Sequence, residues 1–77
     1  MTTLRHDHVI DACHHPCPMP ILMLKRALKT LAPEQVILLQ STDPHSQQDL
    51  THFCQVQGLE VLQQQVENGV FSYYIRS

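Results

Sequence analysis

The sequence predicts an α/β (α+β) two-layer sandwich in which two helices cover one face of a four-stranded mixed sheet. Two segments have apolar residues at helical spacing and four others are strand-like, in the order strand–helix–strand–helix–strand–strand (βαβαββ). An Asn-Gly pair, the strongest short hairpin signal, separates the last two strand-like segments. A right-handed crossover would link the first two strands as a parallel pair.

The first strand and the first helix flank a loop that contains two cysteines. His8 to Asp11 is strand-like, residues 12–17 form the loop, and the helix covers about residues 18–31. The apolar positions of this helix repeat every three or four residues, and they are Ile21, Leu24, Leu28 and Leu31, with Ala27 widening the stripe.

Cys17 stands where this loop meets the helix. Pro18 and Pro20 suit a first helical turn, because the N–H that proline lacks would have no partner there. Cys17 therefore falls at or just before the helix start, where unpaired N–H groups and the positive end of the helix dipole favour an ionised thiol. The thiolate is the reactive form, so Cys17 is the candidate catalytic nucleophile.

The second strand and the second helix occupy the middle of the chain. Residues 35–41 carry a continuous apolar run, Val36 to Leu39, which predicts a buried strand. The second helix covers about residues 45–57, and Gly58 is placed to end it in the left-handed conformation. The apolar face of this helix contains Leu50, Phe53 and Cys54, so Cys54 is predicted to be a buried, inert thiol.

Two N-terminal caps compete at this second helix. Asp43 can cap it with Pro44 at the first helical position, or Ser46 and Asp49 can form a capping box. With either cap, the second helix covers roughly residues 45–57.

The chain closes with a predicted hairpin. Residues 59–66 and 70–76 are strand-like, and Asn68-Gly69 lies in the turn between them. In the last strand Phe71, Tyr73 and Ile75 share one face, which fits a sheet covered on one side only.

Composition limits the class of protein. The chain has 77 residues, 43% hydrophobic, and we expect one domain over residues 1–77 because no linker or repeat divides it. The net charge of −2 argues against direct nucleic-acid binding. No apolar run approaches the roughly 18 residues of a membrane span, and no signal peptide is evident, so we expect a cytoplasmic protein.

Cys13, His14 and His15 precede Cys17 and leave three alternatives open. The spacing of Cys13 and Cys17 fits one half of a zinc site, which would make the protein a metal-binding module. A disulfide between the same two thiols would make it a redox sensor. The third alternative is a solvated loop, and a regulatory binding domain without chemistry is also compatible with the sequence.

The exposed side of the first helix is a candidate docking surface. Lys25, Arg26 and Lys29 lie outside the apolar stripe, as a solvated face or as a patch that binds an acidic partner. Met19 is the first apolar side chain after the candidate nucleophile. Met19, Leu22 and Met23 form either an apolar contact beside Cys17 or the edge of the core.

The chain resembles the TusA-like (also called SirA-like) sulfur-carrier family over nearly its whole length. The resemblance rests on Asp11-Ala12, Cys17-Pro18-Met19-Pro20, Thr42-Asp43-Pro44 and the closing hairpin Leu59 to Arg76. It implies a βαβαββ sandwich in which Cys17 carries sulfur as a persulfide. It also implies that the loop of Asp43 and Pro44 lies near Cys17, so these two residues support the site together with Pro18 and Pro20.

The resemblance further implies the partners. Such carriers take sulfur from a cysteine desulfurase or a rhodanese-like donor and pass it to an acceptor protein, and no cofactor is expected. The downstream uses include tRNA thiolation, molybdenum-cofactor enzymes and sulfur oxidation.

The chain departs from the family pattern at two positions of the loop. His14 stands where the family usually has glycine, and Pro16 stands where it often has a basic residue. Glycine would permit a positive φ that costs a histidine more, so we expect a loop of altered shape.

Overall fold

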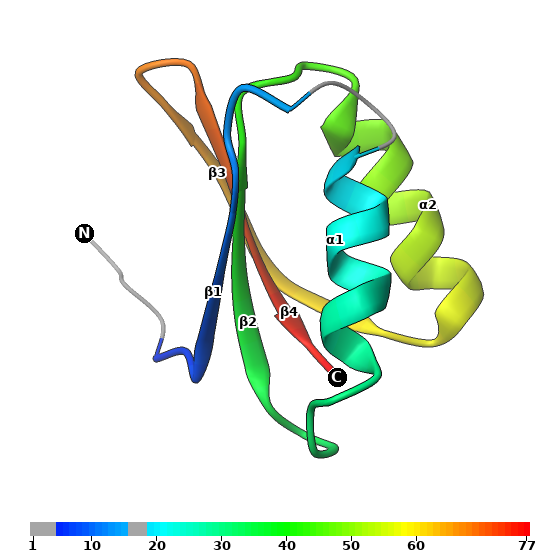
Figure 1. Ribbon diagram of the computed structural model, residues 1–77. Coiled ribbons are helices and arrows are strands. Elements are labelled where there is room, and N and C mark those ends of the chain that lie inside the picture. The colour runs from blue at the N-terminus through cyan, green and yellow to red at the C-terminus, as the bar shows by residue number, and fades with distance from the viewer. Residues whose placement is uncertain (1–4, 16–18) are drawn as a thin grey trace.

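The computed structural model describes residues 5–15 and 19–77 and confirms the predicted two-layer sandwich (Figure 1). Both helices cover one face of a four-stranded sheet whose strand order is β1-β2-β4-β3. The elements are β1 His8–Ala12, α1 Met19–Leu28, β2 Val36–Ser41, α2 Ser46–Gln57, β3 Glu60–Glu67 and β4 Val70–Arg76.

The strand directions bring two loops to the same edge of the sheet. β1 and β2 are parallel, with His8 opposite Ile37 and Ala12 opposite Ser41. β4 is antiparallel to both of its neighbours, β2 and β3. Because β1 and β2 end at the same edge, α1 and α2 both start there (Figure 1). The loops that leave β1 and β2 therefore lie at the same end of the molecule as both helix N-termini.

The core lies between the helices and the covered face of the sheet. Along β2 and β4 every second residue points into it, as the alternation of pleated strands requires. The apolar stripes predicted for the two helices are confirmed, and Cys54 is buried as expected. The core contains Ala12, Leu24, Ile37, Leu39, Leu50, Cys54, Tyr73 and Ile75.

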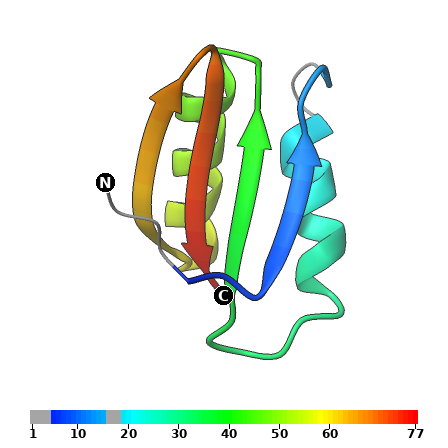
Figure 2. The ribbon, with the colours of Figure 1, turned by 90° about the vertical axis from the view of Figure 1, so that its left-hand side faces the viewer.

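The helix-free face also buries an aromatic side chain. Tyr74 points to this face and is only 3% exposed. Its cross-strand neighbours are Leu38 and Gln63, and the ring of His6 lies against it with ring centroids 6.1 Å apart. The segment before β1 crosses this face near the end of β4, as Figure 2 shows. The sheet is covered by helices on one side only, as predicted, but its open face is not bare.

The helix α1 ends at Leu28, three residues earlier than predicted. The N–H of Lys29 donates to the carbonyl oxygen of Arg26, and the N–H of Thr30 donates to that of Ala27. The hydroxyl of Thr30 donates to the same Ala27 oxygen at 3.1 Å. These bonds span three residues and tighten the end of the helix, so the regular α-helix stops although the apolar spacing continues.

The helix α2 does not begin as either predicted cap would have it. His45 is the boundary residue and no side chain caps it there, while Ser46 is the first helical residue, so the capping box of Ser46 is wrong. Asp43 acts in the turn before the helix instead. Its Oδ1 accepts the N–H of His45 at 2.9 Å, and its carbonyl oxygen accepts the N–H of Ser46 at 3.0 Å.

The residues predicted to lie in turns adopt the left-handed conformation that these turns require. Gly58 has φ 74° and ends α2 with its N–H on the carbonyl oxygen of Gln55. Asn68 and Gly69 both have positive φ, 53° and 78°, as the hairpin turn between β3 and β4 requires.

Candidate functional site

The loop after β1 and the loop after β2 are joined by a hydrogen bond. The backbone N–H of His14 donates to Oγ1 of Thr42 at 2.8 Å, across a sequence separation of 28 residues. The loop that contains Thr42, Asp43 and Pro44 therefore lies beside the turn that contains His14. The implied proximity of Asp43 and Pro44 to Cys17 itself concerns a residue outside the described ranges and stays a prediction.

Cys13 to His15 form a tight turn in which each backbone N–H has an acceptor. The N–H of Cys13 donates to Oδ1 of Asp11 at 3.1 Å, and that of His15 donates to the carbonyl oxygen of Ala12 at 3.2 Å. His14 has φ 66°. It thus adopts a left-handed conformation that glycine would adopt without strain, at the cost of strain in the histidine backbone.

The titration of Cys13 distinguishes it from a reactive thiol. Its side chain is half-buried and free. Burial, together with the neighbouring Asp11 carboxylate, raises the pKa of Cys13, while the hydrogen bond from the Cys13 N–H lowers the pKa of Asp11. The raised pKa favours the protonated form of the Cys13 thiol, which is the less nucleophilic form.

The predicted nucleophile Cys17 lies outside the described residues, as do Pro16 and Pro18. The described chain leaves the turn at His15 and resumes at Met19, the first residue of α1.

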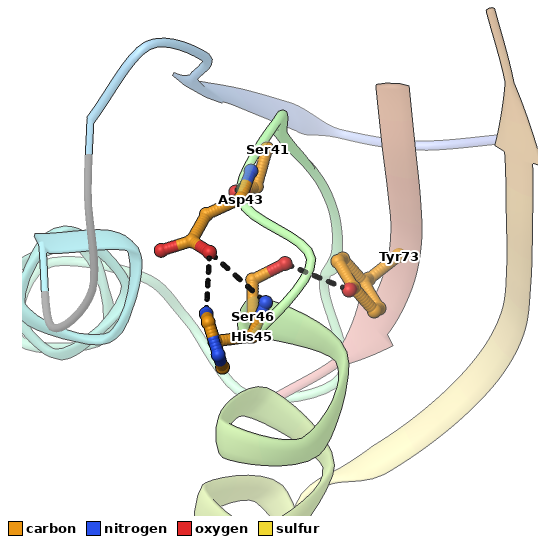
Figure 3. A network of polar contacts seen from close by, with 5 residues as sticks. All are labelled: Ser41, Asp43, His45, Ser46 and Tyr73. Atoms are coloured by element: carbon orange, nitrogen blue, oxygen red, sulfur yellow. Dashed lines mark hydrogen bonds and ion pairs between the residues drawn. The ribbon is translucent and has the colours of Figure 1, made fainter. Parts of the chain in front are cut away.

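The loop after β2 is held by its own side chains (Figure 3). Oγ of Ser41 accepts the N–H of Asp43 at 3.1 Å, and Asp43 Oδ1 also lies 3.2 Å from Nδ1 of His45. One residue further, Oγ of Ser46 and the hydroxyl of Tyr73 form a buried hydrogen bond of 2.9 Å. This bond fastens the loop and the start of α2 to the central strand β4.

Two polar partners of the site were missed by sequence reasoning. Thr42 appeared only as part of a family motif, and no local pattern pairs it with His14. The bond between Ser46 and Tyr73 had one usable signal, since an inward-facing tyrosine on a buried strand requires a partner for its hydroxyl.

The predicted supporting residues differ in their surroundings. Pro20 is fully buried in the first turn of α1, so it packs into the core as well as starting the helix. Pro44 is exposed in the turn before α2, directly after the half-buried Asp43.

The outer side of α1 combines positive charge with exposed apolar side chains. No acidic residue occurs in α1, and Lys25, Arg26 and Lys29 line a shallow hollow together with Leu22, which is 46% exposed. Met19 is 36% exposed, whereas Met23 packs against the core. We call Met19, Leu22, Lys25, Arg26 and Lys29 the α1 surface.

Within residues 5–15 and 19–77, no three histidine, cysteine or acidic side chains gather closely enough to hold a metal ion. The predicted set of Cys13, His14, His15 and Cys17 includes a residue outside these ranges. Neither described helix has the length and apolar character of a membrane span.

Comparisons with known proteins identify the family. Residues 8–77 match the family model described as Sulfurtransferase TusA. Proteins named Sulfur carrier protein TusA from Pseudomonas entomophila (strain L48) and Pseudomonas putida (strain GB-1) are 41% and 40% identical over 76 residues, which cover 99% of this chain and 95% of each relative.

A solved structure supports the same assignment. A SirA-like protein from Desulfitobacterium hafniense superposes with a TM-score of 0.82 at 26% identity, over 92% of this chain and 97% of the other. The match of the family model includes β1, α1 and the segment between them, where the Cys-Pro-Met-Pro sequence lies. The chain belongs to the TusA sulfurtransferase family.

Proposed function

We propose that this protein is a single-domain sulfur carrier that accepts persulfide sulfur on Cys17 and relays it to an acceptor protein. The observation that carries the proposal is the family match over residues 8–77, which spans the Cys17-Pro18-Met19-Pro20 sequence. Homologues that align with 99% of this chain are named sulfur carriers.

The proposed chemistry consists of two balanced exchanges. The Cys17 thiolate attacks the outer sulfur of a donor persulfide, a new sulfur–sulfur bond forms, and the donor cysteine leaves as a thiolate. An acceptor thiolate then attacks the outer sulfur on Cys17, and Cys17 leaves as a thiolate. Cys17 stands two positions before α1, whose N-terminal dipole favours a thiolate, so the first step needs no separate base.

The supporting residues hold the two ends of this region. Pro20 lies in the first turn of α1, and its burial fixes that turn against the core. Pro18, which lies outside the described residues, is proposed to support the same helix start. Asp43 organises the turn before α2, with Pro44 in that turn. None of these four side chains is assigned a chemical step.

Cys13 does not compete for the sulfur in this proposal. Burial and Asp11 raise the pKa of Cys13, so its thiolate fraction at neutral pH is small. We therefore expect the loop to contain one reactive thiol, that of Cys17.

We place partner docking on the α1 surface. Its three cations and its exposed Met19 and Leu22 suit a partner with an acidic, partly apolar patch near the donor sulfur. Charge reversal by Lys25→Glu and Lys29→Glu should raise the KM for the donor several-fold with a weaker salt dependence, while Arg5→Glu should not. An unchanged KM would remove the α1 surface from the proposal.

The proposed partners are a cysteine desulfurase or a rhodanese-like protein as donor and a protein thiol as acceptor, in the cytoplasm. Thiolation of tRNA is one candidate pathway, in which the carrier itself would not contact the nucleic acid.

Intact-protein mass spectrometry tests the proposal. After incubation with a cysteine desulfurase and cysteine, the wild type should gain about 32 Da, one sulfur atom. Cys17→Ser should abolish the gain, and the matched variant Cys13→Ser should retain it. No gain on the wild type, or a gain that persists in Cys17→Ser, would overturn the proposal.

A further inference from the structure

We infer that Thr42 is a positioning residue for sulfur transfer: its hydroxyl holds the turn that precedes Cys17 in the orientation that transfer requires. The inference rests on the proposed function. Thr42 lies on a different loop, 25 positions after Cys17 in the sequence, and would control the reactivity of the Cys17 thiol.

Of the three acceptors that bind N–H groups of the turn, Thr42 is the one that belongs to another loop. The N–H groups of Cys13 and His15 are accepted by Asp11 and Ala12, which belong to the same strand end. These two bonds hold the turn against the end of β1, the strand from which it directly continues. The third bond, from His14 to Thr42, ties the turn to the loop after β2.

The conformation of His14 makes this bond necessary. A non-glycine residue at φ 66° is strained, and a strained backbone persists only when its surroundings hold it. The acceptor of the His14 N–H is therefore the contact most directly able to keep the turn in place. A glycine at this position would have less need of it.

The backbone on both sides of Thr42 is held in place by its neighbours. It stands between Ser41, which is completely buried, and Asp43, whose N–H is bonded to Ser41 Oγ. The buried bond between Ser46 and Tyr73 secures the chain immediately beyond. The position of the Thr42 hydroxyl is thus set by the core, and the hydroxyl transmits that position to the turn.

Both sides of the Cys17 segment are then anchored. His14 lies three residues before Cys17, and the buried Pro20 lies three residues after it. Loss of the Thr42 bond releases one of these two anchors and leaves the other intact. The expected effect is a change in thiol reactivity without loss of the fold.

The test compares Thr42→Val, which keeps the shape and removes the acceptor, with Thr42→Ser, which keeps the hydroxyl. Thr51→Val is the matched control, because the hydroxyl of Thr51 donates to carbonyl oxygens of its own helix turn, those of Gln47 and Gln48. The readouts are the rate of sulfur loading at saturating donor and the pH profile of Cys17 alkylation by iodoacetamide, with label on Cys13 separated by tandem mass spectrometry.

Thr42→Val should slow saturated loading about five-fold, the equivalent of one ordinary hydrogen bond, with little change in KM. It should also move the alkylation midpoint of Cys17 to higher pH, towards that of an ordinary thiol. Thr42→Ser and Thr51→Val should stay within about two-fold of the wild type in rate. A purely structural role would lower the melting temperature without moving the midpoint.

Two results would overturn the inference: a Thr42→Val protein that matches the wild type in both readouts, or a Thr42→Ser protein that is as impaired as Thr42→Val. If Thr42→Val does not fold, Thr42→Ala takes its place in the comparison. If the wild type takes up no sulfur, the proposed function fails, and the alkylation profiles still decide whether Thr42 controls the thiol.

Discussion

The loops after β1 and β2 leave the same edge of the sheet but are held in different ways. The loop after β2 supplies its own acceptors, from Ser41 and Asp43, and is fastened to the core through Ser46 and Tyr73. The loop after β1 has a strained residue, His14, and depends on the other loop for the acceptor of its N–H.

This difference suggests that the position of the loop after β1 depends on the loop after β2, and not the reverse. In our proposal, the loop after β1, which leads to Cys17, takes its position from the loop after β2, which is fastened to the core. The strained and exposed His14 lies in the loop after β1, while the loop after β2 is held by a buried hydrogen bond between Ser46 and Tyr73. Three variants test this dependence.

Tyr73→Phe should have the largest effect on stability. It leaves the buried Ser46 hydroxyl without its partner, so the free energy of unfolding should fall by about 1–3 kcal/mol in urea denaturation. If the dependence runs from the core outward, Cys17 alkylation should also become slower in the folded variant.

The double variant Tyr73→Phe with Ser46→Ala is the control for this bond. Removing both partners leaves no unpaired hydroxyl, so its cost should be smaller than the sum of the two single costs. Additive costs would mean that the two hydroxyls do not stabilise the loop through each other.

His14→Gly should have a smaller effect of opposite sign. It removes the strain at φ 66° while keeping the backbone bond to Thr42, and should raise the free energy of unfolding by about 0.5–1 kcal/mol. His15→Gly is the matched control, because φ is not positive at His15, and it should destabilise. A destabilised His14→Gly protein would contradict the strain assigned to the turn.

Asp11 should produce the smallest effect, one confined to acid pH. Its folded pKa is lowered, mainly by the Cys13 N–H, so its contribution is complete above the ordinary value of 3.8 and is lost as the pH falls through the lowered folded value. The amide NMR signal of Cys13 should shift in that range. Asp11→Asn, which keeps an oxygen acceptor, should remove the pH-dependent shift. An identical titration in both proteins would show that the Asp11 carboxylate is not the group that titrates.

Local patterns in the sequence predicted most of the fold. The spacing of Leu24 and Leu28, the Asn68-Gly69 turn and Gly58 each specify structure within a few residues, so they could be read without tertiary information. The early end of α1 could not, because bonds over three residues compete with a continuing apolar pattern.

The candidate site was less accessible to sequence reasoning. The residue types around Cys17 and the motif of Asp43 and Pro44 located the two loops. The bonds that hold these loops in place link single polar atoms 27 or 28 residues apart: Ser46 with Tyr73 of β4, and His14 with Thr42 of the other loop. Such pairs have no period in the sequence and depend on how the strands and helices pack.

The central claim is that one thiol of this loop carries sulfur and its neighbour does not. Fragment mass spectrometry of the wild type after loading by a cysteine desulfurase tests it most directly, since Cys13 and Cys17 are separated by fragmentation between them. We expect the increment of about 32 Da on fragments that contain Cys17 and none on those that contain only Cys13. Sulfur on Cys13, or shared equally between the two thiols, would contradict it.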